Sequence, residues 1–317
     1  MLFNYLTIAW RNLLKHKLFS CINIFGLAIG LAACLVIFLY VQLELTYDQY
    51  NENKDKIARV TITLHTPESD MVAAFSPDLL ADELQQNYPE VDAATRLVQT
   101  SQVVRYKQDF IRESAFYETD ARVFRVFSFD FIAGDPSNAL KNPESIVISS
   151  SIAKKYFGEG NALGQTMQCN GSTRLVTGIF KDRPVNSDIR IDALLAKDFR
   201  TAKGWVSDIT VFTFVLFKQM PNLHQFGQKL NEFSSRIIQP ELAASGAPNY
   251  NLQFQLEPLA DVHFSTGKLA DTPKGNKSFI YIFSLLAVVI LVIALLNYVN
   301  LSTARSMERA REVGIRK

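Results

Sequence analysis

The chain has 317 residues, of which 48% are hydrophobic, and its 33 basic and 31 acidic side chains leave a formal net charge of +2. This length is enough for two ordinary domains, whereas the hydrophobic share and a mean hydropathy near zero are high for a purely soluble protein. Because the positive charge is concentrated at the two ends of the chain, the composition does not suggest a nucleic-acid-binding protein.

Residues 1–17, MLFNYLTIAWRNLLKHK, place apolar side chains at helical spacing, with basic residues toward the end. This pattern predicts a helix in the cytoplasmic interface of a membrane, with Trp10 at the depth of the lipid headgroups. Alternatively, the segment only extends the following span as its positively charged flank. We favour the interfacial helix.

Two long runs carry no charge: residues 18–43, between Lys17 and Glu44, and residues 278–304, between Lys277 and Arg305. Each exceeds the roughly 20 apolar residues that carry a helix across a bilayer. We therefore predict a transmembrane helix in each run.

The first run could instead be a cleaved targeting segment, because LAAC ending at Cys34 resembles a lipoprotein cleavage site. Cleavage predicts polar sequence soon afterwards, whereas LVIFLYV continues the apolar run. The run is also too long for the apolar region of a signal peptide. We therefore predict that it remains as a membrane anchor.

Small and amide side chains in the two runs are candidate helix-packing positions. Gly26 and Gly30 form G-x-x-x-G, and Cys34 continues the row at four-residue steps, which would let another helix approach closely. Because glycine is common in membrane helices, a specific packing face and a chance occurrence remain equally open. Asn297 and Asn300 in the second run could hydrogen-bond between helices or face the headgroups.

Residues 44–277 are the only part long enough to bury a core. SPDLLADELQQNYPEV predicts a helix capped by Ser76, with Pro77 in its first position. Alternating, β-branched or aromatic stretches before and after this helix predict strands and strand-to-helix units. The predicted stretches are 59–64, 94–106, 109–117, 121–136, 145–158, 174–184 and 209–218. Short strands alternating with helices predict an α+β domain with more than one lobe.

Charge predicts the orientation of the two spans. Basic residues precede the first span and follow the second, so both ends should be cytoplasmic and residues 44–277 should lie outside. The residues concerned are Arg11, Lys15, Lys17, Arg305, Arg309, Arg311, Arg316 and Lys317.

From Phe116 to Ala196 the sequence resembles the periplasmic core domain of MacB-like ABC transporter permeases, the FtsX-like family. The resemblance extends to the opening YLTIAWRNLLKHKLFSCINIFGLAIGLA, to LEPLADVHF and to the terminal ERAREVGIRK, and only residues 199–250 lack a recognised motif. It implies an α+β extracytoplasmic domain inserted between two transmembrane helices of a bacterial inner-membrane protein.

The motifs in the middle of this domain favour structural roles over a ligand site. Gly158 can end a helix and Gly164 can turn the chain back into a strand, while Asp182 and Asn186 can bond their own backbone in a turn. Where the family often has histidine after the Asn-Ser pair, this chain has Asp188, which argues against a side-chain role there. The structural motif comprises Gly158, Gly164, Gly178, Pro184, Asn186 and Ser187.

We find no catalytic residues, metal site or nucleotide-binding motif in the sequence. The four histidines lack metal-ligand spacing, KGNKS lacks the spacing of a phosphate loop, and SIVISSS is not a nucleophile elbow but a buried strand that enters a capped helix. Cys21 and Cys34 lie about 20 Å apart along one helix, so they cannot form a disulfide and Cys169 is left alone. The chain is predicted not to be an enzyme and to bind no cofactor, with ATP and magnesium on a partner ATPase.

Residues 305–317 are predicted to continue the second transmembrane helix into the cytoplasm, because only Gly314 interrupts the helix formers after Leu291. Taken alone, the pattern favours a solvated, positively charged flank. The resemblance reverses this preference, because such permeases carry the ERxREVGIRK pattern opposite the partner ATPase. The implied ATPase-coupling residues are Glu308, Arg309, Arg311, Glu312 and Gly314.

The resemblance implies a permease that couples ATP hydrolysis in a separate cytoplasmic ABC ATPase to movement of the outer domain, for export of a peptide, lipoprotein or toxic small molecule. Implied partners are a second permease copy or paired half, a periplasmic adaptor, an outer-membrane factor and membrane lipids, without nucleic acid. Two alternatives remain open: an FtsX-like regulator of a cell-wall hydrolase, and a two-span sensor with a periplasmic ligand-binding domain. Since further transmembrane helices normally follow in such permeases, we expect the chain to be part of a longer or split protein.

Overall fold

The computed structural model describes residues 17–199 and 204–315, so the predicted interfacial helix lies outside the described residues except for Lys17. The chain forms two compact units. One is helical and comprises the described residues up to Thr46 and from Asn276 onward, and the other is an α+β unit from Tyr47 to Gly275.

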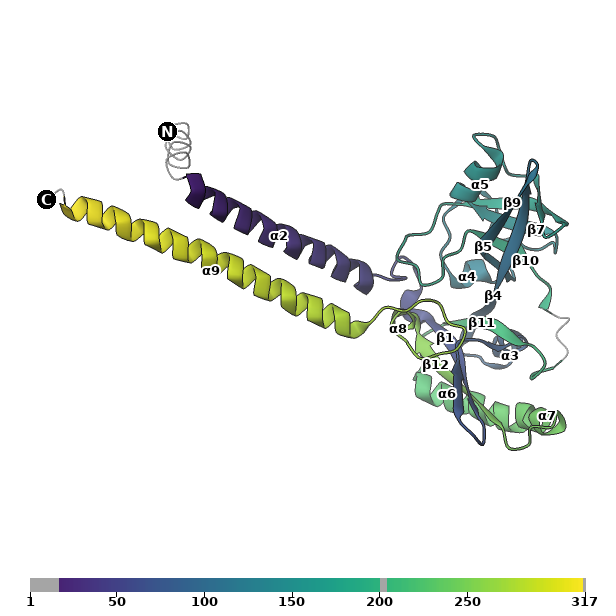
Figure 1. The fold of residues 1–317 in the computed structure, drawn as a ribbon. Coiled ribbons are helices and arrows are strands. Elements are labelled where there is room, and N and C mark those ends of the chain that lie inside the picture. Colours follow the sequence, from purple (N-terminus) through teal and green to yellow (C-terminus); the bar gives the residue numbers. More distant parts are fainter. Residues whose placement is uncertain (1–16, 200–203, 316–317) are drawn as a thin grey trace. The chain divides into compact units, whose positions relative to one another are not determined.

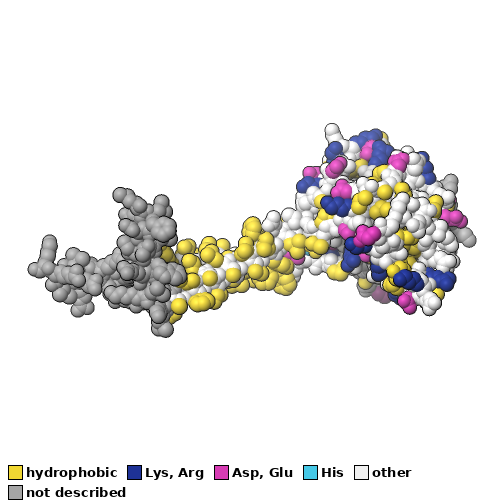
Figure 2. All heavy atoms as spheres, turned by 90° about the horizontal axis from the view of Figure 1, so that it is seen from above, with side chains coloured by type: hydrophobic (Ala, Val, Ile, Leu, Met, Phe, Trp, Pro, Cys, Tyr) yellow, Lys and Arg dark blue, Asp and Glu magenta, His cyan; other side chains and the backbone are white. Residues whose placement is uncertain are grey.

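The helical unit consists of α2 (Lys17–Leu45) and α9 (Lys277–Ile315), which pack against each other along their lengths (Figure 1). Within them, Ile24–Leu45 and Lys277–Asn300 are long and apolar enough to span a membrane. Figure 2 shows hydrophobic side chains over the surface of this unit, whereas charged side chains are scattered over the α+β unit. Such an apolar surface suits contact with lipid and is unfavourable in water.

The α+β unit is built on one connected sheet with the strand order β12-β1-β11-β4-β5-β10-β7-β9-β6. Short strands add to it, since β2 pairs with β1, β3 with β11, and β8 with both β4 and β9. Among the strands that the structure describes, only the β5–β10 and β7–β9 pairs are parallel. The strands are β1 (Ile57–His65), β2 (Asp70–Ala73), β3 (Ser76–Pro77), β4 (Val91–Tyr106), β5 (Asp109–Thr119), β6 (Phe131–Gly134), β7 (Ser145–Ser149), β8 (Thr166–Cys169), β9 (Ser172–Phe180), β10 (Ala193–Ala196), β11 (Ile209–Phe217) and β12 (Asn251–Pro258).

Short helices cover the sheet and divide its core into three apolar clusters. Helices α6 and α7 pack at the β12 end of the sheet and α5 packs near β7 and β9, with α4 and α8 contributing to the cluster between them (Figure 1). The helices are η1 (Lys54–Lys56), α3 (Leu80–Asn87), α4 (Val123–Val126), α5 (Ser150–Phe157), α6 (Leu223–Phe233), the π-helical turn η3 (Ser234–Ile238), α7 (Gln239–Ala244) and α8 (Leu259–Val262).

Two local predictions are wrong. Ser76 and Pro77 form strand β3 rather than the start of a helix, because the Ser76 hydroxyl donates to Thr213 Oγ1 on β11 (2.7 Å) and α3 begins only at Leu80. The stretch 121–136 was expected to be a strand, but it contains helix α4 before β6. Val123 and Val126 lie three residues apart, so one helical turn buries both side chains.

Candidate functional site

The glycine row of α2 lies against α9 of the same chain. A Cβ atom added at Gly26 would lie 3.3 Å from Asn297 Nδ2, and one added at Gly30 would lie 3.2 Å from Ala294 Cβ. Further along the row, the Cys34 thiol donates to the carbonyl of Ala287 (3.3 Å). Small side chains here let the two backbones approach, which is the usual way in which membrane helices pack.

The two asparagines of α9 differ in position. Asn297 is half-buried beside Gly26, whereas the Asn300 side chain is exposed. The proposed ATPase-coupling residues Glu308, Arg309, Arg311, Glu312 and Gly314 belong to α9 by their backbone, but their side chains lie outside the described part of the structure.

Two linkers connect the α+β unit to the long helices in sequence. The first linker, Tyr47–Asn51, follows α2, and the second linker, Leu269–Gly275, precedes α9. Both are bound by the turn at residues 184–188, which follows β9 and contains the predicted Pro-Asn-Ser motif.

The first linker is held by the motif residues of this turn. The Asp48 amide donates to the carbonyl of Asn186 (2.9 Å), and the Ser187 hydroxyl donates to the carbonyl of Pro184 (2.8 Å) and lies within hydrogen-bonding distance of the hydroxyl of Tyr50 (3.0 Å). The motif therefore joins the turn to the chain that leads out of α2.

Asp188, the next residue, holds both linkers. Its amide donates to Asp48 Oδ2 (3.3 Å), while its buried carboxylate accepts hydrogen bonds from Lys274 Nζ (2.8 and 3.0 Å) and from the Thr272 hydroxyl (2.7 Å). His263 Nδ1 lies 3.4 Å from the same carboxylate. The expectation against a side-chain role at this position is wrong, because the carboxylate accepts hydrogen bonds from two side chains distant in sequence and lies within ion-pair distance of a third.

His263 also contacts both linkers. Its ring stacks on that of Tyr47, with the ring centroids 3.4 Å apart and the planes 9° from parallel. Its backbone carbonyl accepts the amide of Gly275 (2.9 Å). The beginning of one linker and the end of the other therefore meet at one residue, the first at its ring and the second at its backbone.

A chain of buried ion pairs continues from the second linker into the sheet. Lys274 lies 3.1 Å from Asp271, whose carboxylate takes two hydrogen bonds from Arg59 (2.6 and 2.8 Å). Arg59 on β1 also donates to Glu257 (2.6 Å), its direct neighbour on β12, and Glu257 lies 3.1 Å from Lys268. Because a buried charge is costly unless it is paired, this alternation of acids and bases fixes the linker on the two strands.

Burial and pairing set the pKa values in this network. Burial raises the pKa of Asp48 to about 6, against the attraction of Arg183. Burial also acts to raise the pKa of Asp188, but the hydrogen bond with His263 and the charge of Lys274 outweigh it and hold that pKa below its usual value. At Asp271, the hydrogen bonds and charge of Arg59 likewise overcome burial and lower the pKa.

The remaining motif residues shape the backbone. Ser149 caps α5 by accepting the amide of Ile152, and Gly158 ends this helix with φ +66°. Gly164 turns toward β8 with φ +79°. A Cβ atom added at Gly178 would lie only 2.7 Å from the Phe131 ring, so the close approach of β9 to β6 requires glycine.

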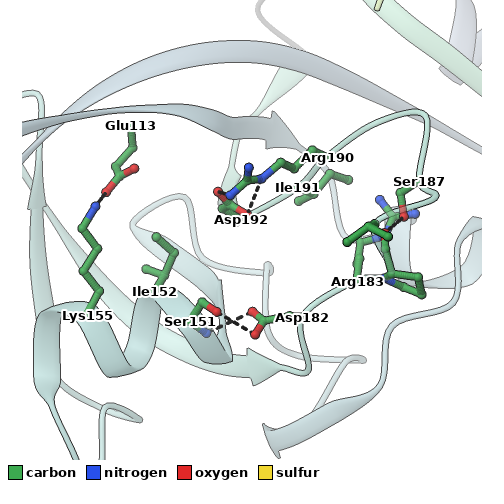
Figure 3. Close-up of a pocket in the computed structure, with 12 residues that line it drawn as sticks. Glu113, Ser151, Ile152, Lys155, Asp182, Arg183, Ser187, Arg190, Ile191 and Asp192 are labelled. Atoms are coloured by element: carbon green, nitrogen blue, oxygen red, sulfur yellow. Dashed lines mark hydrogen bonds and ion pairs between the residues drawn. The ribbon is translucent and has the colours of Figure 1, made fainter. Parts of the chain in front are cut away.

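Next to the 184–188 turn lies a cavity of about 500 Å³ (Figure 3). Four of its charged side chains form two ion pairs: Lys155 with Glu113 (2.6 Å) and Arg190 with Asp192 (3.2 Å). The Asp182 carboxylate accepts from the amide and hydroxyl of Ser151 in the first turn of α5, and not from its own backbone as predicted. Since cationic and anionic side chains are mixed over its lining and most of them are bonded within the protein, the cavity favours no particular ligand class.

Within residues 17–199 and 204–315, no three histidine, cysteine or acidic side chains are grouped so as to hold a metal ion. Cys169 is buried as a free thiol, and burial raises its pKa to about 11. The arrangement around Asp188 binds and positions chain segments.

Comparison with known proteins places this fold. The family of MacB-like periplasmic core domains matches residues 20–232. A probable syringafactin export ATP-binding/permease protein of Pseudomonas syringae is 25% identical over 98% of this chain and 45% of its own length. A probable export ATP-binding/permease protein of Pseudomonas fluorescens is 25% identical over 98% of this chain and 46% of its own length. The chain thus spans about half the length of the curated relatives it matches.

A solved domain of a permease protein from Porphyromonas gingivalis superposes with a TM-score of 0.58 at 18% identity, covering 74% of this chain and 98% of that domain. This likeness supports the fold and confirms the expected α+β domain. Because the family match covers more than half of the residues, the chain belongs to the MacB-like periplasmic core domain family of ABC transporter permeases, and it has two candidate transmembrane helices.

Proposed function

We propose that this chain is a permease component in which ATP hydrolysis by a cytoplasmic ABC ATPase on a separate chain moves the periplasmic domain and thereby exports a peptide, lipoprotein or toxic small molecule. The ATPase and its bound ATP and magnesium are the partners that the proposal requires. In this proposal, both ends of the chain are cytoplasmic.

The observation that carries the proposal is the length of α9. The helix has 39 residues, whereas its candidate membrane span, Lys277–Asn300, has only 24. At about 1.5 Å per residue, the whole helix is roughly 58 Å long and exceeds the roughly 30 Å thickness of the hydrocarbon core. An unbroken helix transmits displacement along its axis, so it can link a cytoplasmic ATPase to the second linker.

A second permease copy, or a paired permease half, would complete the membrane assembly in this proposal. The row of Gly26 and Gly30 packs against α9 within the chain, so a second copy would use other faces of the helical pair. The exposed apolar side chains on these helices, such as Phe25, Ile29 and Ile293, supply such faces. A periplasmic adaptor and an outer-membrane factor would act on the periplasmic domain.

The test is affinity purification of the tagged, membrane-extracted chain from its native cells, with an ATPase assay of the proteins that copurify. We expect an ABC ATPase whose activity depends on the permease, and we expect the double substitution Glu308→Arg and Glu312→Arg to abolish this dependence while membrane insertion is unchanged. Glu68→Arg, at an exposed position of the periplasmic domain, is the matched charge-reversal control.

Different copurifying proteins would decide against the proposal. A cell-wall hydrolase recovered with the ATPase would favour an FtsX-like regulator. A kinase recovered without any ATPase would favour a two-span sensor. Unchanged ATPase stimulation by the doubly reversed variant would remove Glu308 and Glu312 from the coupling role.

A further inference from the structure

We infer that Asp188, His263 and Lys274 are positioning residues for the proposed coupling: they clamp the linkers of both long helices to the sheet, so that the two linkers move as one body. This inference rests on the proposed function and names the residues through which motion of α9 would reach the periplasmic domain. We call these three residues and Asp271 the linker clamp.

The second linker has no slack. Its start is bonded to the sheet edge, because the Leu269 amide donates to Val72 (2.8 Å) and the Leu269 carbonyl accepts from Ala74 (3.1 Å). Its end is bonded to His263 through Gly275 (2.9 Å). Between these points the side chains of Asp271 and Lys274 are buried in ion pairs. A linker of this kind cannot stretch before its attachments break.

The side-chain attachments of the second linker are buried ion pairs. Lys274 lies three positions before Lys277, the first residue of α9, and its ammonium group bridges Asp188 (2.8 Å) and Asp271 (3.1 Å). All three side chains are almost completely buried. Separating a buried ion pair leaves a desolvated charge without its partner, so the pairs resist displacement more strongly than exposed pairs do.

The first linker is also bonded to the turn at residues 184–188, which contains Asp188. Asp48 bonds to Asn186 and Asp188 through its backbone and carboxylate, respectively, and Tyr47 stacks on His263. A displacement that enters through Lys274 therefore reaches the linker of α2 through Asp188 and His263, without passing through the apolar core. A contiguous set of contacts with defined geometry of this kind can carry coupling between distant sites.

The test uses the complete membrane-extracted complex with its ATPase. The variants are Asp188→Asn, Lys274→Gln and the exchanged pair Asp188→Lys with Lys274→Asp. Lys155→Gln is the matched control, because it breaks an ion pair of similar length with Glu113 in the same domain and touches neither linker. Each variant is assayed well below its own unfolding midpoint, for bound ATPase, for permease-dependent ATPase rate and for amide hydrogen exchange at residues 269–275.

We expect Asp188→Asn and Lys274→Gln to retain the ATPase but to lower the permease-dependent rate by about fivefold or more, which is the lower range of typical coupling effects. Exchange at residues 269–275 should become faster in the same variants. The exchanged pair should recover part of the lost rate, and Lys155→Gln should keep the wild-type rate. Recovery by exchange is not expected if the two residues only stabilise the fold.

The outcomes separate the two proposals. If the wild-type chain binds no ATPase, the proposed function fails and this inference fails with it. If Asp188→Asn binds the ATPase and speeds exchange at residues 269–275 while the permease-dependent rate stays at the wild-type value, the clamp is only structural, and this inference alone is overturned.

Discussion

Replacing Asp48 with asparagine should stabilise the periplasmic domain at pH 8 and progressively less as the pH falls. Asp48 is buried, and burial, opposed mainly by Arg183, raises its pKa from 3.8 to about 6. Since one pKa unit corresponds to about 1.36 kcal/mol, this difference amounts to roughly 3 kcal/mol between the folded and unfolded states. Asparagine keeps an oxygen that can accept the Asp188 amide, without the charge.

The sign follows from the raised pKa. Between pH 3.8 and about 6, the folded Asp48 keeps a proton that the unfolded chain has lost, so the domain loses stability as the pH rises through this window. Above this pH window, Asp48 is ionised in both states, and its buried charge lowers the free energy of unfolding by the full difference of roughly 3 kcal/mol. The substitution should therefore raise the free energy of unfolding by about 3 kcal/mol at pH 8 and by about half as much at pH 5.

Urea unfolding of the full chain in mild detergent measures this effect. Trp205 packs on Phe233 with the ring centroids 4.9 Å apart, so its fluorescence reports on the periplasmic domain. Asp130→Asn, at an exposed carboxylate, is the control and should change stability by less than about 0.5 kcal/mol at either pH. Equal stabilisation by Asp48→Asn at pH 5 and pH 8, or destabilisation at pH 8, would refute the reasoning.

Three further outcomes are expected. Gly30→Val should weaken the packing of α2 on α9 by about 1–3 kcal/mol, because the added Cβ would lie 3.2 Å from Ala294 Cβ. Thermal unfolding in detergent should show a lower midpoint for this variant than for the control Leu31→Val, which changes an exposed side chain. Equal midpoints would contradict the contact. Ser149→Ala should cost about 1 kcal/mol in urea unfolding through loss of the α5 cap, and an unchanged midpoint would show that the cap contributes nothing. Cys169, buried and with its pKa raised to about 11, should react with maleimide at pH 7 only after urea is added; modification of the folded domain as fast as of exposed Cys21 would exclude this burial.

Features that depend on neighbouring residues could be predicted from the sequence. An uncharged run longer than a bilayer gives an apolar helix whatever surrounds it, which is why α2 and the first part of α9 were expected. Alternating β-branched and aromatic residues gave β4, β5 and β11 to within a few residues at each end. The cap at Ser149 was likewise local, since a serine there accepts an amide only three residues ahead.

Features that depend on distant partners could not be predicted. Ser76 has the sequence pattern of a helix cap, but it forms strand β3 because it pairs with β11, which is distant in sequence. The groups that bond to Asp188 belong to residues more than 70 positions away in sequence, on both sides of it. The presence of aspartate where related sequences often have histidine therefore suggested that this side chain has no role. In the folded chain, its carboxylate binds the second linker.

The sequence by itself therefore determined the two apolar helices, the α+β character of the domain between them and the family to which the chain belongs. The tertiary structure decided that the two linkers meet at Asp188 and His263, that the glycine row of α2 faces α9 of the same chain, and that burial raises the pKa of Asp48 to about 6. Helix and strand formation depend on periodicities within a few residues, whereas burial and charge pairing depend on which distant segments the folded chain brings together.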